Sequence, residues 1–298
     1  MSSYLELTAR ERVQRLFDAG SFVEFLPPSA RVISPHLGQL DAPVSFDDGV
    51  VVGSAKLGGQ LVFAAAQEGG FMGGAVGEVH GAKLVGLLKR AIAEKVGAVV
   101  LLMETGGVRL HEANAGLIAV SEVMRAVLDA RAAGVAVITL AGGANGVFGG
   151  MGIVARCTNA IVMSEEGRLA MSGPEVIETA SGVEEFDSRD RALVWRTTGG
   201  KHRYLLGDCQ AIVADSVDEF RQAAIDAIAV CRAQSTALNL QDLEREQAML
   251  GERIERFGAM SDPLEVWAAL GVEQPSAIPM LDAAEFIAAA APHRMGGR

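Results

Sequence analysis

The stretch Gly97-Ala-Val-Val-Leu-Leu-Met-Glu-Thr-Gly-Gly-Val-Arg109 joins an unbroken apolar run to a pair of glycines. An apolar run that does not alternate with polar residues is typical of a strand covered by helices on both faces of a parallel sheet. Glycines directly after such a strand favour a tight turn, because glycine adopts backbone conformations that other residues avoid. This stretch therefore predicts one strand–turn–helix unit of an α/β fold.

The same order of elements recurs on both sides of this unit. A pair of glycines, Gly58-Gly59, separates two strand-like segments and predicts a hairpin. Short connections between parallel strands predict right-handed crossovers. On this pattern we expect strands at residues 49–57, 60–66, 97–103, 135–141, 160–163 and 210–213, and helices at residues 79–94, 112–132, 151–156 and 216–233.

Both ends of the chain are expected to be helical. Thr8 followed by Glu11 forms a capping-box pattern, and an apolar stripe follows it. Three segments near the other end, residues 240–257, 263–270 and 282–290, have helical periodicity. No low-complexity linker interrupts the sequence. We therefore predict a single domain over residues 1–298, with a core at about 45–235 and a helical extension at about 240–298.

Composition excludes several classes of function. The chain has 298 residues, a net charge of −11 and no long basic segment, which argues against nucleic-acid and membrane partners. Its three cysteines form no CxxC pair, so we expect reduced thiols, a cytoplasmic location and no metal site. An acidic surface also makes an anionic carrier protein a difficult partner unless docking is local or involves another subunit.

Three pairs of glycines lie where a strand passes into a helix: Gly73-Gly74, Gly106-Gly107 and Gly149-Gly150. The first N–H groups of a helix have no partner inside the helix, and glycine lets a ligand approach them closely. Two such turns on adjacent strands could aim two N–H groups at one oxygen, as an oxyanion hole does. Plain structural turns are an alternative reading of each pair. None of the three matches a dinucleotide fingerprint or a P-loop.

Longer motifs carry a family resemblance. The segment Thr105-Gly-Gly-Val-Arg-Leu-His-Glu112 resembles the SGGARxQE segment of the carboxyltransferase subunits of biotin-dependent carboxylases, and Phe148-Gly-Gly-Met151 lies where those subunits have a second glycine pair. Gly173-Pro-Glu-Val-Ile-Glu178 resembles their GPxVIE stretch. With the run Glu184-Glu-Phe-Asp-Ser-Arg-Asp-Arg191, the sequence is most similar to malonate decarboxylase beta subunits, over roughly residues 8–271.

This resemblance implies a fold, a reaction and partners. The fold would be crotonase-like, a superhelix of ββα units with a helical C-terminal extension. The chain would pair with a homologous gamma subunit, and an acyl carrier protein would present a malonyl thioester on a dephospho-CoA-derived, phosphopantetheine-type arm. Decarboxylation to the acetyl thioester passes through an enolate, which needs an oxyanion hole but neither a metal nor a covalent nucleophile.

Catalytic roles are expected for few residues. Gly106, Gly107, Gly149 and Gly150 are predicted to form the two halves of the oxyanion hole. Glu175 is a candidate proton donor for the carbanion, although a carboxylate at the start of a helix would explain the same residue and a water molecule could supply the proton.

Binding of the carrier arm is expected next to these residues. Gly73, Gly74 and Gly77 are predicted to contact the arm together with Lys83, which could equally be a solvated helix charge. Arg109 is a candidate anion ligand at a helix start, with an ion pair to Glu112 as the alternative.

Two other functions remain open on the sequence. A subunit of a biotin-dependent acyl-CoA carboxylase, or of a biotin-dependent malonate decarboxylase, needs the same enolate but passes the carboxyl group to biotin. A non-catalytic scaffold subunit with a degenerate site belongs to a different class, and the retained glycine pairs count against it.

Overall fold

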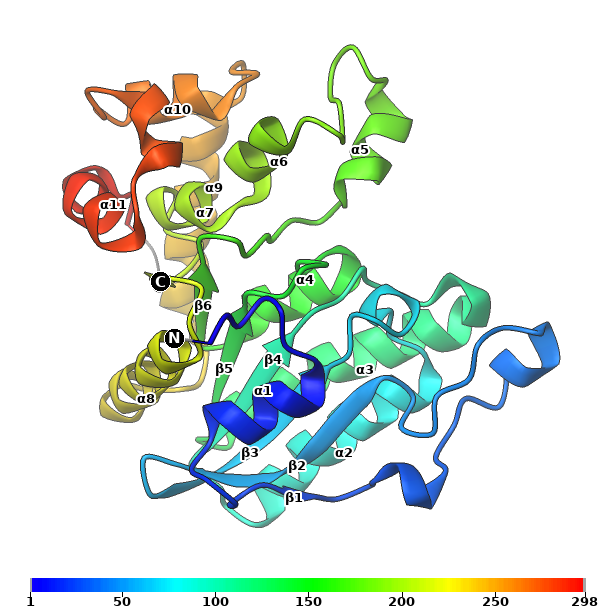
Figure 1. The fold of residues 1–298 in the computed structure, drawn as a ribbon. Coiled ribbons are helices and arrows are strands. Elements are labelled where there is room, and N and C mark those ends of the chain that lie inside the picture. The colour runs from blue at the N-terminus through cyan, green and yellow to red at the C-terminus, as the bar shows by residue number, and fades with distance from the viewer. Residues whose placement is uncertain (1, 297–298) are drawn as a thin grey trace.

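The computed structural model describes residues 2–296 and contains one seven-stranded sheet. Its strands follow one another in chain order, with β1 to β3 antiparallel and β3 to β7 parallel. Figure 1 shows the sheet twisting through the lower part of the molecule. The strands are β1 (Val23–Glu24), β2 (Val50–Leu57), β3 (Gln60–Gln67), β4 (Ala98–Met103), β5 (Ala136–Ala141), β6 (Ala160–Ser164) and β7 (Ala211–Val213).

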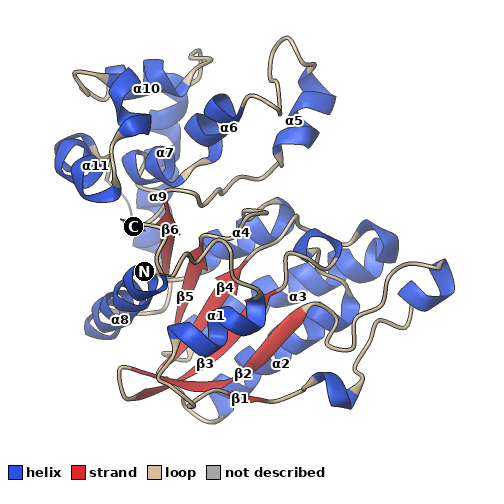
Figure 2. Cartoon of the chain, in the orientation of Figure 1, coloured by secondary structure: helices blue, strands red, loops and turns tan. Residues whose placement is uncertain are grey.

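Helices cover both faces of this sheet (Figure 2). On one face, α2 and α3 bury Leu84, Leu88 and Val123 against β4 and β5. On the other face, α1 and α8 bury Val13 and Phe220. The helices as far as α8 are α1 (Ala9–Leu16), α2 (Glu78–Ala93), α3 (Ala113–Ala132), α4 (Gly149–Cys157), α5 (Pro174–Ser181), α6 (Arg191–Thr198), α7 (Gly200–Leu205) and α8 (Val217–Ala233).

The C-terminal part is helical, as predicted. It consists of α9 (Leu240–Phe257), α10 (Pro263–Ala269) and α11 (Ala283–Ala290). These helices gather with α6 and α7 beside the β6 end of the sheet (Figure 1). Among the described residues, none of the helices has the length and apolar character needed to cross a membrane.

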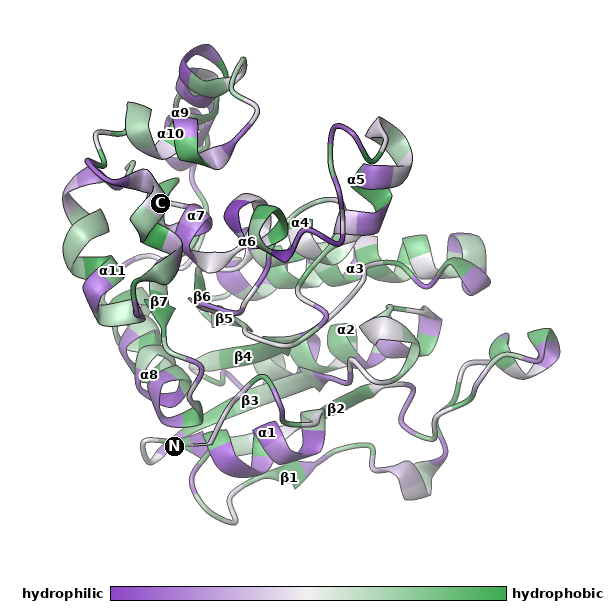
Figure 3. Ribbon diagram, turned by 45° about the horizontal axis from the view of Figure 1, so that its top comes forward, coloured by the Kyte–Doolittle hydropathy of each residue, from purple (hydrophilic) through white to green (hydrophobic). Residues whose placement is uncertain are grey.

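Local sequence signals are confirmed at several places. Thr8 and Glu11 form the predicted capping box at the start of α1. The hairpin of β2 and β3 turns at Gly58-Gly59, where both glycines have positive φ. Every residue of β4 and of β5 is buried, as expected for strands between two helical layers, and both are coloured hydrophobic in Figure 3.

Three helices, α5, α6 and α7, lie within residues 174–205, where the sequence analysis gave no helix boundaries. Helix α5 begins with a proline, Pro174, at its first position. The Asp190 side chain caps α6 by accepting a hydrogen bond from Leu193 N–H. The charge run that precedes α6 therefore supplies a helix cap rather than only a solvated surface.

Candidate active site

Four loops leave the sheet at one edge, where the parallel strands β3, β4, β5 and β6 end. A second, short ladder joins these loops side by side through parallel bridges between Val76 and Val108, Thr105 and Val147, and Val147 and Leu169. Each repeat thus adds one segment to the main sheet, one to the short ladder, and then a helix. This arrangement is the predicted ββα repeat, and it fixes the relative positions of the glycine turns.

The turns after β4 and β5 touch one another at their glycines. A Cβ placed on Gly107 would lie 3.1 Å from Gly149 Cα, and a Cβ placed on Gly149 would lie 2.9 Å from Gly107 Cα. Both residues also have positive φ, 111° and 62°. Any side chain at either position would meet backbone as well as conformational strain. The two turns therefore converge, as the oxyanion-hole prediction requires.

The N–H groups of these turns are not equally free. Gly106 N–H donates to Gly73 O (2.8 Å), and Gly149 N–H donates to Met171 O (2.9 Å). Gly107 N–H donates to the Thr105 hydroxyl at 3.0 Å. Three of the four predicted glycines therefore already use their donors inside the protein.

Two neighbouring N–H groups lack an acceptor among residues 2–296: those of Val108 and Gly150. Gly107 O accepts from Val76 N, and the N–H of a trans peptide points opposite to its C=O. Val108 N–H therefore points away from Val76. Gly150 lies in the first turn of α4, where N–H groups project from the helix end. Sequence reasoning found the turns but missed Val108, because the free donor depends on partners far along the chain.

A buried carboxylate supports the loops from below. Glu104, directly after β4, pairs with Arg12 of α1 and accepts from Asn145 N–H at 3.1 Å. A Cβ on Gly69 or Gly143 would lie within 2.4 Å of its carboxylate atoms, so both loops pack closely on Glu104. Because Glu104 contacts the loops after β3 and β5 while it ends β4, it ties three of the four loops together.

Arg168 holds the second glycine turn from its outer side. Its guanidinium lies 5.7 Å from the ring centroid of Phe148 and 4.6 Å from that of Trp195, and it donates to Ala144 O. Burial lowers the pKa of Arg168, although an arginine remains charged at neutral pH. The stack fixes Phe148, the residue before Gly149, and thereby the start of α4.

The first glycine pair lies against the second. Gly73 O accepts from Gly106 N–H, and a Cβ on Gly74 would lie 1.9 Å from Glu104 O. Gly77 precedes α2, and a Cβ there would lie 2.5 Å from a carboxylate oxygen of Glu112. Close packing accounts for Gly74 and Gly77, whereas Gly73 has open space beside it and a positive φ of 65°. These close approaches place the loop of residues 73–77 directly beside the turn after β4.

The structure corrects the roles expected for Lys83 and Arg109. Lys83 is buried, and its ammonium group donates to Asp47 O and Val50 O rather than facing a ligand. The Arg109 guanidinium contacts Asp48 Oδ1 at 2.9 Å and Glu112 Oε1 at 2.8 Å, and it is fully shielded from solvent. Arg109 is paired with two carboxylates and the Lys83 ammonium group is bound by two backbone carbonyls, so neither side chain is available to a carrier arm. The ion pair with Glu112 is the alternative that the sequence offered for Arg109, whereas Asp48 and the partners of Lys83 are distant in sequence and gave no local signal.

Within the cluster around Arg109, burial and ion pairing shift the pKa values of the carboxylates in opposite directions. Burial raises the pKa of Asp48 despite the neighbouring Arg109. Burial also acts to raise the pKa of Glu112, but hydrogen bonds from Glu78 N–H, Ser34 and Arg109 outweigh it and leave that pKa lowered. Burial lowers the pKa of Lys83. The cluster anchors the start of α2, because Glu112 accepts from Glu78 N–H at 2.6 Å.

Glu175 lies in the first turn of α5, and its side chain is exposed. The same segment reaches the second glycine turn through Met171, whose carbonyl accepts from Gly149 N–H. The structure therefore brings the Glu175 segment to the site through its backbone. The carboxylate belongs to the first turn of the helix, whose N-cap is Gly173, as the alternative reading expected.

Several large apolar side chains close in sequence to the converging turns are exposed to solvent. Leu110 follows the first turn by three residues and is 82% exposed, and Met171, which accepts from Gly149, is 68% exposed. Leu117 and Ile118 on α3 are exposed as well. Several large apolar groups open to solvent beside one site are typical of a protein interface.

Ligand chemistry at the site is that of backbone amides. Among residues 2–296, no group of three or more histidine, cysteine, aspartate or glutamate side chains is arranged to hold a metal ion. The N–H groups described above are the donors that the turns offer, and the positive end of the α4 dipole lies behind Gly150.

Comparison with known proteins agrees with this arrangement. The carboxyl transferase domain family matches residues 5–214. The chain is 42% identical to malonyl-S-ACP:biotin-protein carboxyltransferase MADC of Malonomonas rubra, over 97% of this chain and 95% of that protein. It is also 34% identical to the propionyl-CoA carboxylase beta chain of Saccharopolyspora erythraea, over 67% of this chain and 36% of that one.

A solved structure extends the likeness to the fold. A chain of a Pseudomonas malonate decarboxylase hetero-tetramer in complex with malonate superposes with a TM-score of 0.76 at 40% identity, covering 83% of this chain and 91% of that chain. Sequence and fold thus agree over most of the molecule, including the loops that form the site. The chain belongs to the carboxyl transferase domain family, with the crotonase-like fold, and is a carboxyltransferase-type subunit related to malonate decarboxylase.

Proposed function

We propose that this chain is the beta subunit of a malonate decarboxylase, which converts a malonyl thioester on an acyl carrier protein to the acetyl thioester and CO2. The observation that carries the proposal is the contact between the turns at Gly107 and Gly149, with free N–H groups at Val108 and Gly150. Malonyl-S-ACP is in the printed name of the relative from Malonomonas rubra, and malonate decarboxylase is in the description of the Pseudomonas structure.

The reaction needs a place for negative charge. The bond between the α-carbon and the carboxylate breaks, CO2 leaves, and the electron pair moves through the α-carbon onto the thioester oxygen as an enolate. Val108 N–H and Gly150 N–H would donate to that oxygen more strongly as its charge grows, which lowers the barrier. The helix dipole of α4 adds to this effect at Gly150.

Protonation of the α-carbon completes the reaction. The enolate reverts to the thioester as the carbon takes one proton, and the acetyl group remains on the carrier. We keep Glu175 as the proposed donor, because its segment is bonded to the second turn through Met171. The exposed carboxylate would reach the α-carbon only when the substrate and a partner subunit cover it, so water is the competing donor.

The proposed partners are a homologous gamma subunit and an acyl carrier protein. The exposed apolar groups at Leu110, Leu117, Ile118 and Met171 fit a hetero-oligomeric interface beside the turns, and the related Pseudomonas chains come from a hetero-tetramer and a hetero-dimer. The phosphopantetheine-type arm would pass along residues 73–77, because Gly73 O bonds Gly106 N–H in the adjacent turn.

A second candidate reaction has one specific observation in its favour. The relative at 42% identity is named as a biotin-protein carboxyltransferase, so the carboxyl group would pass to biotin instead of leaving as CO2. The enolate and its two N–H donors are the same in both reactions. The difference lies in whether a biotin carrier is required.

A direct test measures CO2 from malonyl-S-ACP with the chain purified together with its gamma subunit. Release of CO2 in the presence of avidin, with no biotin protein added, supports the decarboxylase. Formation of acetyl-S-ACP that requires a biotin carrier, with the carboxyl group recovered on biotin, assigns the carboxyltransferase reaction instead. If the complex forms no acetyl-S-ACP with or without a biotin carrier, both reactions are contradicted. The remaining function is that of a scaffold subunit, which only assembles the complex.

A further inference from the structure

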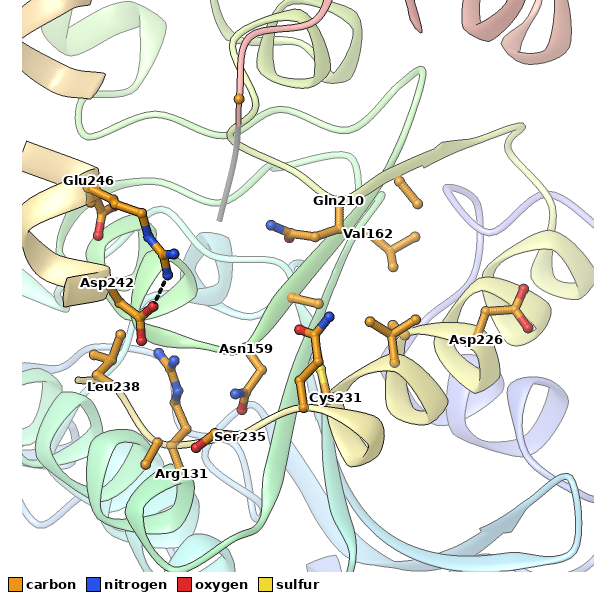
Figure 4. Close-up of a pocket in the computed structure, with 18 of the residues that line it drawn as sticks. Arg131, Asn159, Val162, Gln210, Asp226, Cys231, Ser235, Leu238, Asp242 and Glu246 are labelled. Atoms are coloured by element: carbon orange, nitrogen blue, oxygen red, sulfur yellow. Dashed lines mark hydrogen bonds and ion pairs between the residues drawn. The ribbon is translucent and has the colours of Figure 1, made fainter. Parts of the chain in front are cut away.

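Helix α9 (Leu240–Phe257) turns its charged side toward the protein. Its Arg253 guanidinium lies 2.9 Å from Asp208 Oδ1, and Glu246 lies 3.1 Å from Arg156. A cavity of about 770 Å³ separates part of the helix from α8 and the edge of β6 and β7. Figure 4 shows Asp242 and Glu246 projecting from α9 toward this cavity. Apart from its last residue, Phe257, which is buried in the core, the helix is attached mainly by ion pairs.

The apolar stripe of α9 points the other way. Leu240, Leu243, Leu250 and Ile254 are all exposed, with 71% of Leu240 and 73% of Ile254 open to solvent. Their spacing of three, seven and four residues places them on one face of a helix, as in a heptad repeat. Gln247 occupies the same face between Leu243 and Leu250 and is exposed as well.

Single exposed leucines are ordinary on protein surfaces. A surface helix normally buries its apolar stripe, but the stripe of α9 is exposed and side chains such as Arg253 and Glu246 form ion pairs on the inner side instead. Four large side chains along one face, with charges directed inward, form a continuous apolar strip. The heptad spacing is the pattern that receives another helix through interdigitated side chains.

Charge beside the strip indicates what kind of helix fits. Glu244 and Glu255 border its free side, both are exposed, and neither has an ion-pair partner within residues 2–296. A helix lying on the strip would bring its own flank against these carboxylates, and like charges there are unfavourable. A second copy of α9 would bring the same two glutamates. Anionic lipid would be repelled for the same reason.

We propose that α9 is a docking site for an amphipathic helix of a different protein chain, apolar on one side and with lysine or arginine along the flank that meets Glu244 and Glu255. This binding surface is separate from the converging glycine turns, which lie at the carboxyl ends of the strands. The proposal goes beyond the proposed reaction and does not depend on which acyl thioester the site takes.

Designed peptides provide a probe of known chemistry. One labelled peptide carries a heptad apolar stripe with lysine flanks, and a second carries the same stripe with glutamate flanks. We expect the lysine peptide to bind the full-length chain at least ~10-fold more tightly by fluorescence anisotropy, as charges flanking an apolar seam set partner choice. Equal affinity for the two peptides, or no binding of either, would overturn the proposal.

Variants locate the binding on the strip. Leu250→Asp with Ile254→Asp should weaken binding of the lysine peptide by at least ~10-fold, because buried apolar anchors dominate such interfaces. Ala248→Asn, at an exposed position on the flank of Glu244 and Glu255, changes no charge, is the matched control and should leave binding nearly unchanged. Glu244→Lys with Glu255→Lys should reverse the preference to the glutamate peptide. Circular dichroism checks that each variant keeps its helical content.

Two further outcomes count against this occupant. If sedimentation shows that the chain forms a dimer which Ile254→Asp dissociates, the strip pairs with a second copy of itself. If the chain binds vesicles of phosphatidylcholine and phosphatidylserine, and Leu250→Asp abolishes that binding, the strip faces lipid. Either result replaces the proposed partner helix.

Discussion

The edge that carries the glycine turns and the C-terminal helix α9 are held in opposite ways. At the edge, buried ion pairs such as Arg109 with Asp48 and Glu112 lie beneath loops whose glycines touch one another. In α9, the ion-paired side chains Asp242 and Glu246 line a cavity, and four large apolar side chains face solvent. The first region leaves no room to adjust its geometry, which suits catalysis by fixed backbone donors. The second has surface left for a partner.

The largest effect is expected from replacing a buried arginine at the edge, compared with the same replacement of an exposed arginine. Arg109→Met leaves Asp48 and Glu112 buried without their cation, and we expect the free energy of unfolding to fall by about 3–5 kcal/mol. Urea denaturation followed by circular dichroism measures it. Arg125→Met on the exposed face of α3, where Arg125 pairs only with Glu122, is the control and should show no measurable change. An equal response of both variants would contradict the picture of a rigid, charge-anchored edge.

The proposed donor at Gly150 can be removed with little change of shape. A Cβ at Gly150 would lie 2.8 Å from a methyl carbon of Val120, so each variant also carries Val120→Ala to make room. Proline lacks the N–H and is tolerated in the first turn of a helix. Gly150→Pro should therefore lower kcat by about 10²–10³-fold, as for loss of one oxyanion-hole donor.

The matched control for this loss is Gly150→Ala with Val120→Ala, which keeps the N–H and the added volume. It should retain most of the kcat that Gly150→Pro loses. Size-exclusion chromatography with the partner subunit checks that both double variants still assemble. If the alanine and proline forms lose the same activity, the N–H of Gly150 is not a donor to the enolate.

Sequence alone predicted the features that depend on neighbouring residues. The capping box at Thr8, the hairpin at Gly58-Gly59 and the buried strands each have a short local cause, and the structure confirms them. The glycine turns were also predicted, because glycines directly after a buried strand mark a close approach. Their convergence followed from adjacent parallel strands ending at one edge.

Features that depend on distant partners were not predictable. The sequence offered the local pair of Arg109 with Glu112, but Arg109 also meets Asp48 across 61 positions, and nothing nearby in the sequence indicates that contact. Which amides are free was partly hidden for the same reason, since Met171 and Gly73 occupy the donors of Gly149 and Gly106. The sequence predicted α9 as a helix with an apolar stripe. The direction in which that stripe faces depends on ion pairs with distant parts of the chain.

A smaller effect is expected from pH within the C-terminal helices. Trp267 Nε1–H donates to His202 Nδ1 at 3.1 Å, and burial lowers the pKa of His202 to about 3. An unfolded histidine has a pKa of about 6.5. Below that pH the unfolded chain binds a proton that the folded chain excludes, so stability is complete above about pH 6.5 and falls as the pH drops toward about 3.

The variant that isolates this group is His202→Gln, whose side-chain oxygen can still accept from Trp267. It should remove about 1.4 kcal/mol per pH unit from the slope of stability against pH below about 6.5. Urea titrations at several pH values between about 7 and 5 measure the slope. His36→Gln, on an exposed histidine that contacts Glu78, is the control. An unchanged slope in His202→Gln would show that this histidine does not stay neutral in the folded chain.

The mildest prediction returns to α9 with the substitution used at the edge. Arg253→Met removes a cation from Asp208, but Arg203 and Arg156 remain within 3.2 and 3.5 Å of that carboxylate. The loss of unfolding free energy should therefore be about 1 kcal/mol, because no buried charge is left without a partner. The same urea titration used for Arg109→Met measures it. A loss as large as that of Arg109→Met would show that α9 is anchored as firmly as the edge that carries the glycine turns. The apolar strip on so rigid a helix would then present a preformed surface to its partner.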